Sequence, residues 1–231
     1  IWIVAGISFF ITFLLLSFAK EDFIRKKVRI KNSFNKIKKQ SIVSIKYAKN
    51  HPVLFLFLIA SAIIVFAELF SGDFAWVTLL QELNFPEYAF GYMWSALGLM
   101  GIFGSLLSLK FMKKGKERKF ILITIILAAI VSLLIIFVES VGFALVILLS
   151  SLFFFHLRRP AERTYFHKFI PNKLRATVGS VESMLIGIIG IIAMPIAGLS
   201  VDLIGARYTI LISALMMIPA ILIFLRIKNK E

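Results

Sequence analysis

Seven long apolar runs constrain the fold of this chain more than any other feature. They cover residues 1–19, 51–82, 88–109, 120–138, 141–157, 177–201 and 208–225. The hydrocarbon core of a bilayer is about 30 Å thick, and an α-helix needs roughly 20 mostly apolar residues to cross it. Hydrophobic residues make up 60% of the 231 residues, more than a soluble domain carries. We therefore predict an all-α membrane protein with seven transmembrane helices.

The charged segments between these runs predict the domain organisation. We expect a transmembrane helix over 1–19, a basic linker over 20–50, a six-helix transmembrane bundle over 51–225 and a short tail over 226–231. Apolar residues recur loosely at helical spacing in the linker, which fits either a helix lying among lipid headgroups or a solvated linker. The chain begins without Met, and its first run lacks the basic segment and cleavage site of a signal peptide. We therefore expect a sequence truncated at its N-terminus.

The positive charges are confined to alternate loops. Eleven Lys and Arg residues lie in 20–49, six in 110–119, six in 158–175 and three in 226–230, which leaves only Arg207 of the 27. Loops rich in Lys and Arg stay in the cytoplasm, so we expect the first residue outside and the C-terminus inside a cell (inner) membrane. We also expect these loops to bind anionic lipid headgroups. The net charge of +15 does not indicate a nucleic-acid partner, because no soluble segment interleaves basic and aromatic residues.

Two loop sequences and the helix count resemble those of a known family. The segment RRPAERTYFHKFIPNKLRATVGS follows the fifth run, and KFMKKGKERK separates the third run from the fourth. They are similar to the loop between helices ten and eleven, and to the second glycine-and-basic loop, of the major facilitator superfamily. Ser108 stands where that second loop motif has an Asp. With this order of spans, the chain resembles helices six to twelve of such a transporter.

This resemblance implies a function and a partner. It implies a secondary transporter that moves a small molecule by alternating access, with the substrate cavity between two six-helix halves. Helices one to five of the first half would then be the partner of this chain. Aromatic and Met residues outnumber polar ones in the spans, which favours efflux of amphipathic compounds.

Acidic and hydroxyl residues inside the runs are the candidates for a substrate or proton site. An ionised side chain in hydrocarbon costs at least about 2.5–3.5 kcal/mol, so Glu68, near mid-membrane, is expected to bind a cationic group or carry a coupling proton. The alternative is a neutral Glu68 that only packs against a neighbouring helix. Helical spacing puts Ser71 and Trp76 on the same stripe. Asp73 lies in the outer half, where outside water or a ligand reaches it. The candidates are therefore Glu68, Trp76, Ser71, Asp73 and Ser150, with Ser151 beside the last.

One further acid suggests a gate. Glu182 lies one to two turns into the sixth run, where Arg158, Arg159 or Arg175 could reach it. Such a pair would either open and close as the halves move or simply fix the helix ends. Rows of small residues in the third and sixth runs are expected to be packing surfaces. They are Gly91, Ser95, Gly98, Gly101, Ser105 and Ser108, and Gly179, Ser183, Gly187, Gly190, Ala193, Ala197 and Gly198.

Other function classes lack their motifs. The chain has no Cys, and its His and acidic residues show no metal-ligand spacing, so we expect no metal and no cofactor beyond a coupling proton. We expect no enzyme, because neither HExxH nor a Ser/His/Asp set at one depth is present. The alternatives to a transporter are an intramembrane lipid-modifying enzyme and a non-transporting scaffold or sensor.

Overall fold

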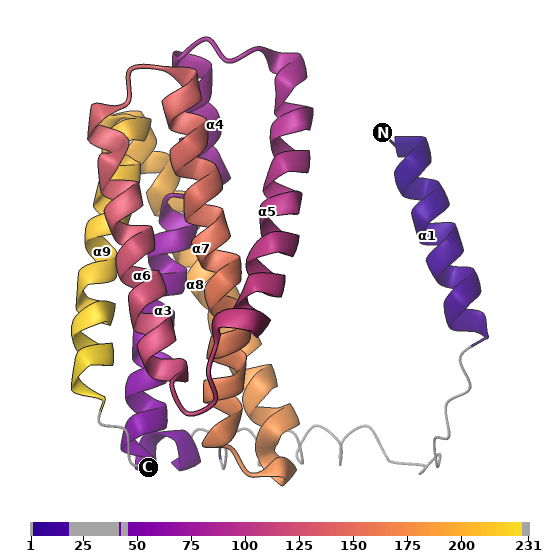
Figure 1. Cartoon of the computed structure of the whole chain (residues 1–231), viewed down its shortest axis with the longest axis vertical. Helices are drawn as coiled ribbons and strands as arrows, with labels where there is room; N and C mark the ends of the chain where they lie inside the picture. Colours follow the sequence, from indigo (N-terminus) through magenta and orange to yellow (C-terminus); the bar gives the residue numbers. More distant parts are fainter. Residues whose placement is uncertain (1, 19–41, 43–45, 228–231) are drawn as a thin grey trace. The chain divides into compact units, whose positions relative to one another are not determined.

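The computed structural model describes residues 2–18, 42 and 46–227, and every regular element in this part is a helix. The chain divides into two compact units, residues 1–38 and 39–231. The first contains the apolar helix α1 (Trp2–Ser17) (Figure 1). The proposed headgroup helix of the linker falls mostly outside the described residues and stays a prediction.

The second unit contains a bundle of long helices. Six of its segments are long and apolar enough to cross a membrane, counting α3 with α4, and they follow six of the seven predicted spans. The helix α1 is shorter, so a first span over 1–19 stays a prediction. The elements are α3 (Pro52–Phe70), α4 (Asp73–Glu82), η1 (Glu87–Ala89), α5 (Phe90–Phe111), α6 (Glu117–Leu133), η2 (Leu134–Phe137), α7 (Val141–Lys168), η3 (Asn172–Leu174), α8 (Arg175–Ile204) and α9 (Ala206–Arg226).

The second predicted span is interrupted, whereas the sequence suggested one helix over 51–82. The helix α3 ends at Phe70 and α4 starts at Asp73. The Ser71 hydroxyl lies 3.3 Å from the carbonyl of Ala67, which provides a local partner at the helix end. A Cβ on Gly72 would lie 2.9 Å from the Leu69 carbonyl oxygen, so the turn accepts only a residue without a side chain. The break thus lies in the membrane-spanning region, close to Glu68.

The fifth predicted span was wrong at its C-terminal boundary. It was placed at 141–157, but α7 continues to Lys168 and passes through Pro160. The reason is a row of buried residues at four-residue spacing, Leu157, Ala161 and Tyr165, that continues beyond the apolar run. Arg158 and Arg159 are therefore inside a membrane-spanning helix and not in a loop, so their charges need partners within the bundle or water.

The alternating direction of the helices brings the basic loops together. Residues 46–51, 110–119, 168–175 and 226–227 lie at one end of the bundle, which we call the basic end (Figure 1). Residues 82–89, 138–141 and 202–207 lie at the other, acidic end. Arg207 at the acidic end is not free, because its guanidinium donates to the carbonyl of Val138.

Two apolar clusters form the core, one toward each end. At the basic end Phe57 contacts the rings of Tyr165, Phe166 and Phe224, with centroids 5.6–5.9 Å apart. The other cluster contains Trp76 and further buried residues of α4, α5, η2, α7 and α9. The clusters end at Ala67 of α3 and Ala161 of α7 on one side, and at Ala75 of α4 and Leu148 of α7 on the other. The stretches between them carry Glu68, Asp73, Arg158 and Arg159.

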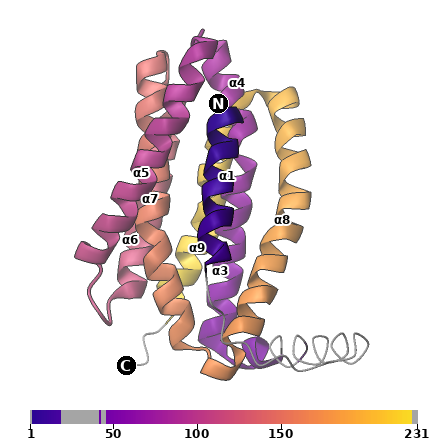
Figure 2. The same cartoon turned by 90° about the vertical axis from the view of Figure 1, so that its right-hand side faces the viewer.

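The helices α5 and α8 flank the bundle (Figure 2). The α5 helix packs on α7, and α8 packs on α3 and α9. The expected packing role of small residues holds at Gly101 of α5, where a Cβ would lie 3.2 Å from the His156 side chain on α7. The closest approach is at Gly104, which was not among the residues expected to pack: a Cβ there would lie 2.8 Å from the carbonyl oxygen of Phe153 on α7. It does not hold within this bundle at Gly91 and Gly98 of α5 or at Gly179, Gly187 and Gly198 of α8, where no atom lies within 4 Å of an added Cβ. Among the glycines of these two helices, tight contact is limited to Gly101 and Gly104 of α5, and a Cβ on Gly190 of α8 would be in ordinary contact with Leu69 at 3.7 Å.

Candidate functional site

A cavity of about 410 Å³, which we call the central cavity, lies in the middle of the bundle. Its wall is formed by residues from α3 and every later α-helix, so no single element encloses it. Its apolar part combines aliphatic side chains with six aromatic and sulfur-containing ones: Phe74, Trp76, Trp94, Phe155, Met194 and Met217. Its charged residues are Glu68, Asp73, Arg158 and Arg159. Ligand pockets have this size and this combination of an apolar wall with a few polar groups.

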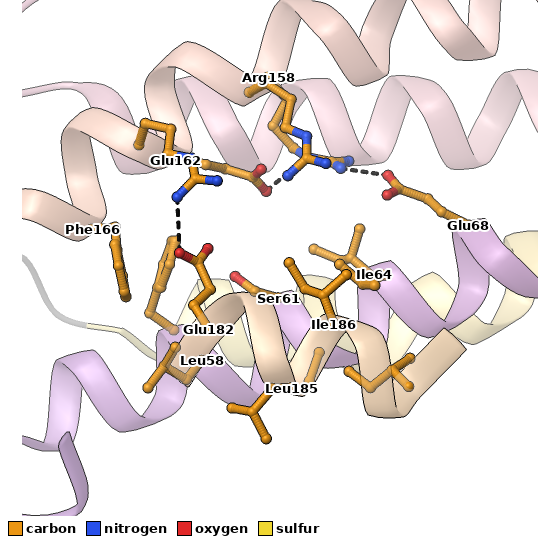
Figure 3. Close-up of a pocket in the computed structure, with 16 residues that line it drawn as sticks. Leu58, Ser61, Ile64, Glu68, Arg158, Glu162, Phe166, Glu182, Leu185 and Ile186 are labelled. Carbon is orange, nitrogen blue, oxygen red and sulfur yellow. Dashed lines mark hydrogen bonds and ion pairs between the residues drawn. The ribbon is translucent and has the colours of Figure 1, made fainter. Parts of the chain in front are cut away.

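Arg158 is the centre of the buried charge cluster. Its side chain is 2% exposed, and one of its terminal nitrogens donates to Oε1 of Glu68 on α3 (Figure 3). Its Nε lies 2.7 Å from Oε1 of Glu162, one turn further along α7. Since a buried charge is stable only when it is paired, two carboxylates around one guanidinium explain how Arg158 is tolerated here. The cluster couples α3 to α7.

The carboxylates of this cluster are more accessible than the arginine. The side chain of Glu68 is 21% exposed and that of Glu162 is 13% exposed. Glu68 lines the central cavity, so water entering the cavity reaches its carboxylate. The cationic partner expected for Glu68 is thus supplied by the chain itself.

A second, smaller cavity of about 40 Å³ lies on the basic-end side of the cluster (Figure 3). It is bordered by Glu68, Glu162 and Glu182, and by Ser61, whose buried hydroxyl has no partner among the described residues. A space of this size holds one or two water molecules, and polar walls favour their presence. We call it the small chamber.

Glu182 is paired with a residue that the sequence did not suggest. Its Oε2 lies 2.9 Å from a terminal nitrogen of Arg163 on α7, and not beside Arg158, Arg159 or Arg175. The cause is the helical continuation of α7, which directs Arg158 into the bundle and brings Arg163 to the rim near α8. The pair connects α7 to α8 across the small chamber.

Arg159 differs from its neighbour. It lines both cavities and its guanidinium carbon lies 4.7 Å from the ring centroid of Phe155. In the part of the chain that the structure describes, no carboxylate lies within ion-pairing distance of it. A ring face contributes about 0.5–2 kcal/mol to a cation, and it leaves the edge of the guanidinium free.

The remaining candidates divide between wall and surface. Ser71 and Asp73 line the central cavity, with Asp73 exposed at the first turn of α4, where a helix N-terminus stabilises a carboxylate. Ser150 is not part of the cavity wall. Its neighbour Ser151 is, and the Ser151 hydroxyl lies 3.1 Å from that of Ser132 on α6. The sequence thus predicted that a serine of α7 lies at the depth of the cavity, but not that Ser151, and not Ser150, faces it.

A further ion pair at the basic end was not predicted. Glu117, which is 2% exposed, accepts a hydrogen bond from the Gly115 amide at 3.1 Å and one from Lys168 at 2.7 Å. It fixes the loop between α5 and α6 to the end of α7. The only signal was a single acid inside the basic segment KFMKKGKERK. Among the residues that the structure describes, no group of three or more His, Asp or Glu could hold a metal ion.

Comparison with known families supports the resemblance suggested by the loops. The Major Facilitator Superfamily model matches residues 1–180, which is more than half of the chain. Comparison with curated proteins gave no match. The helical bundle with six candidate membrane spans agrees with the fold of that family. The chain therefore belongs to the major facilitator superfamily, a family of membrane proteins that transport small molecules.

Proposed function

We propose that this chain forms one half of a secondary active transporter that works by alternating access. The observation that carries the proposal is the central cavity, which combines an aromatic and sulfur-rich wall with a charge cluster in mid-span. In this mechanism two bundles rock against each other around a central substrate. The substrate would lie against Trp76 and Trp94, near the break between α3 and α4.

The other bundle would consist of helices one to five of the transporter together with residues 1–19. The surface of residues 39–231 that would face helices one to five includes the open face of α8, the least buried of the six spans. The open positions Gly187 and Gly198 allow another helix to approach closely. Lipid would cover the rest of the apolar exterior, with anionic headgroups at the basic end.

The pair between Arg163 and Glu182 would act as a gate at the basic end. It spans two helices that line the small chamber, and half of the Arg163 side chain is exposed, so the pair can open at low cost. We place this end in the cytoplasm of a cell (inner) membrane, because it carries most of the Lys and Arg residues.

Glu68 would carry the coupling proton. Arg158 has two carboxylate partners, so protonation of Glu68 leaves the guanidinium with Glu162 and frees α3 to move relative to α7. The small chamber connects this cluster to the basic end through Ser61 and Glu182, which gives a proton a polar route.

We also propose a direction of transport, namely efflux. The reason is that the apolar, aromatic wall of the central cavity fits amphipathic compounds.

Substitution of Glu68 by Gln in the complete transporter tests this role. The protein is reconstituted into liposomes with rhodamine 6G or carboxyfluorescein, and the dye that the unmodified protein transports faster is followed. We expect Glu68→Gln to abolish transport driven by a pH gradient, because the amide cannot accept the proton, while dye exchange without a gradient persists. Glu82→Gln, at an exposed position of α4, is the matched control and should behave as the unmodified protein. Unchanged coupling in Glu68→Gln would remove Glu68 from the mechanism.

A further inference from the structure

The central cavity is lined by two acidic and two basic residues, but one of the basic side chains is not part of an ion pair. Glu68 and Glu162 share Arg158, Glu182 is paired with Arg163, and Asp73 lies at the N-terminus of α4. Arg159 is the cation of this region that has no carboxylate partner among the described residues. A guanidinium inside a membrane-spanning helix needs a counter-charge or water.

The contact with Phe155 positions Arg159. Its guanidinium carbon lies 4.7 Å from the ring centroid, and among the described residues no acceptor forms a hydrogen bond with its N–H groups, so these donors stay available. The planar edge of the guanidinium matches the two oxygens of a carboxylate and forms parallel hydrogen bonds with it. The same cavity has Trp76 and Trp94 in its wall, so a flat apolar body fits beside the charged group.

We propose that the substrate is an organic anion, with a carboxylate bound by Arg159 and an aromatic or apolar body that lies against the tryptophans. The inference rests on the proposed transport function and adds the sign of the substrate charge. It differs from the first expectation for this site, a cationic group at Glu68, because Arg158 already occupies that carboxylate. Binding of the anion would place a negative charge next to the Glu68, Arg158 and Glu162 cluster and compete for its guanidinium, which gives substrate and proton a common point of contact.

The test uses three ligands with the same body and different charges. They are 2-naphthoate, 2-naphthamide and protonated 2-naphthylmethylamine, and their binding to the complete transporter in nanodiscs is measured by equilibrium dialysis. We expect the naphthoate to bind about tenfold or more tightly than the amide, since a charge-assisted hydrogen bond contributes at least that ratio. Arg159→Gln should remove this preference, and Arg159→Lys should keep part of it. Lys110→Gln, an exposed change outside the cavity, should leave it intact.

Two comparisons separate this inference from the proposed function. Ala128→Phe fills the cavity wall and should abolish binding of any ligand that occupies the cavity. If the ammonium or the amide binds as tightly as the naphthoate and is lost in Ala128→Phe, the cavity is a substrate site and the anion inference is wrong. The inference is also wrong if the preference for the naphthoate survives Arg159→Gln in a variant with normal thermal stability. If none of the three ligands binds, the result counts against both the anion inference and the proposed substrate site in the central cavity.

Discussion

Replacement of Arg158 by glutamine is expected to abolish transport and to lower the stability of the protein. The guanidinium is almost completely buried, and its removal leaves the carboxylates of Glu68 and Glu162 without a counter-charge. Breaking a buried ion pair on one side costs about 3–5 kcal/mol. Access of water to the two carboxylates reduces this cost, so the lower part of the range is expected. The measurements are thermal unfolding of the solubilised protein and dye transport in liposomes.

A neutral version of the cluster separates stability from function. The triple variant Glu68→Gln, Arg158→Gln and Glu162→Gln removes all three charges, so its thermal stability should recover most of the loss. Its transport should not recover, because no carboxylate remains that can alternate between binding a proton and pairing with the guanidinium of Arg158. Lys110→Gln serves as the control for removal of one positive charge at an exposed position. Normal transport by the triple variant would show that the cluster is only structural, as the scaffold alternative requires.

Replacement of Gly104 by alanine is expected to lower the stability of the protein almost as much as replacement of Arg158 by glutamine. Its Cβ would lie 2.8 Å from the Phe153 carbonyl oxygen, 3.0 Å from the Leu157 amide nitrogen and 3.0 Å from the His156 Cβ. Two of these contacts are backbone atoms, so α5 and α7 must separate. Overpacking of this kind costs about 1–3 kcal/mol. Because Arg158 follows directly on α7, the shift also displaces the charge cluster, and transport should decrease with stability.

Gly142→Ala is the matched control, since this glycine is on α7, is exposed and has no atom within 4 Å of an added Cβ. It should leave the unfolding temperature and the transport rate unchanged. Equal effects of the two substitutions would contradict close packing of α5 on α7. A decrease in transport without any decrease in stability for Gly104→Ala would place the effect in movement of the helices and not in their packing.

The sequence predicted the helix order well, because apolar run length and charge distribution are properties of single segments. Six spans and the gathering of basic loops at one end follow from these two patterns. The end of α7 was missed because its last turns are amphipathic and no longer apolar, so a hydropathy criterion stops at Leu157. The break between α3 and α4 was also missed, and one long helix was predicted there. The reason is that neither Ser71 nor Gly72 alone interrupts an apolar run.

The sequence predicted how deep in the membrane-spanning region the site residues lie, but not which acidic and basic residues form ion pairs. Glu68, Trp76 and Ser71 do line a common cavity, as the stripe on the second span indicated. The partner of Glu68 is distant in sequence, and the choice among several arginines depends on how α7 is rotated against α3. The same rotation selects Arg163 over its neighbours as the partner of Glu182. The four-residue spacing of Arg158 and Glu162 was the one local signal for the cluster.

Access to the central cavity from both sides of the membrane tests the account most directly. A cysteine at Ser151 in the cavity wall is exposed to a membrane-impermeant thiol reagent in right-side-out and in inside-out vesicles, with any cysteines outside residues 1–231 replaced. Cysteines at Lys114 and Glu139 report the two ends. We expect labelling of position 151 from both sides, of 114 only from inside and of 139 only from outside, with Glu182→Gln increasing the labelling of 151 from inside. Labelling of 151 from one side only would contradict alternating access, and labelling of 114 and 139 from the same side would contradict the topology.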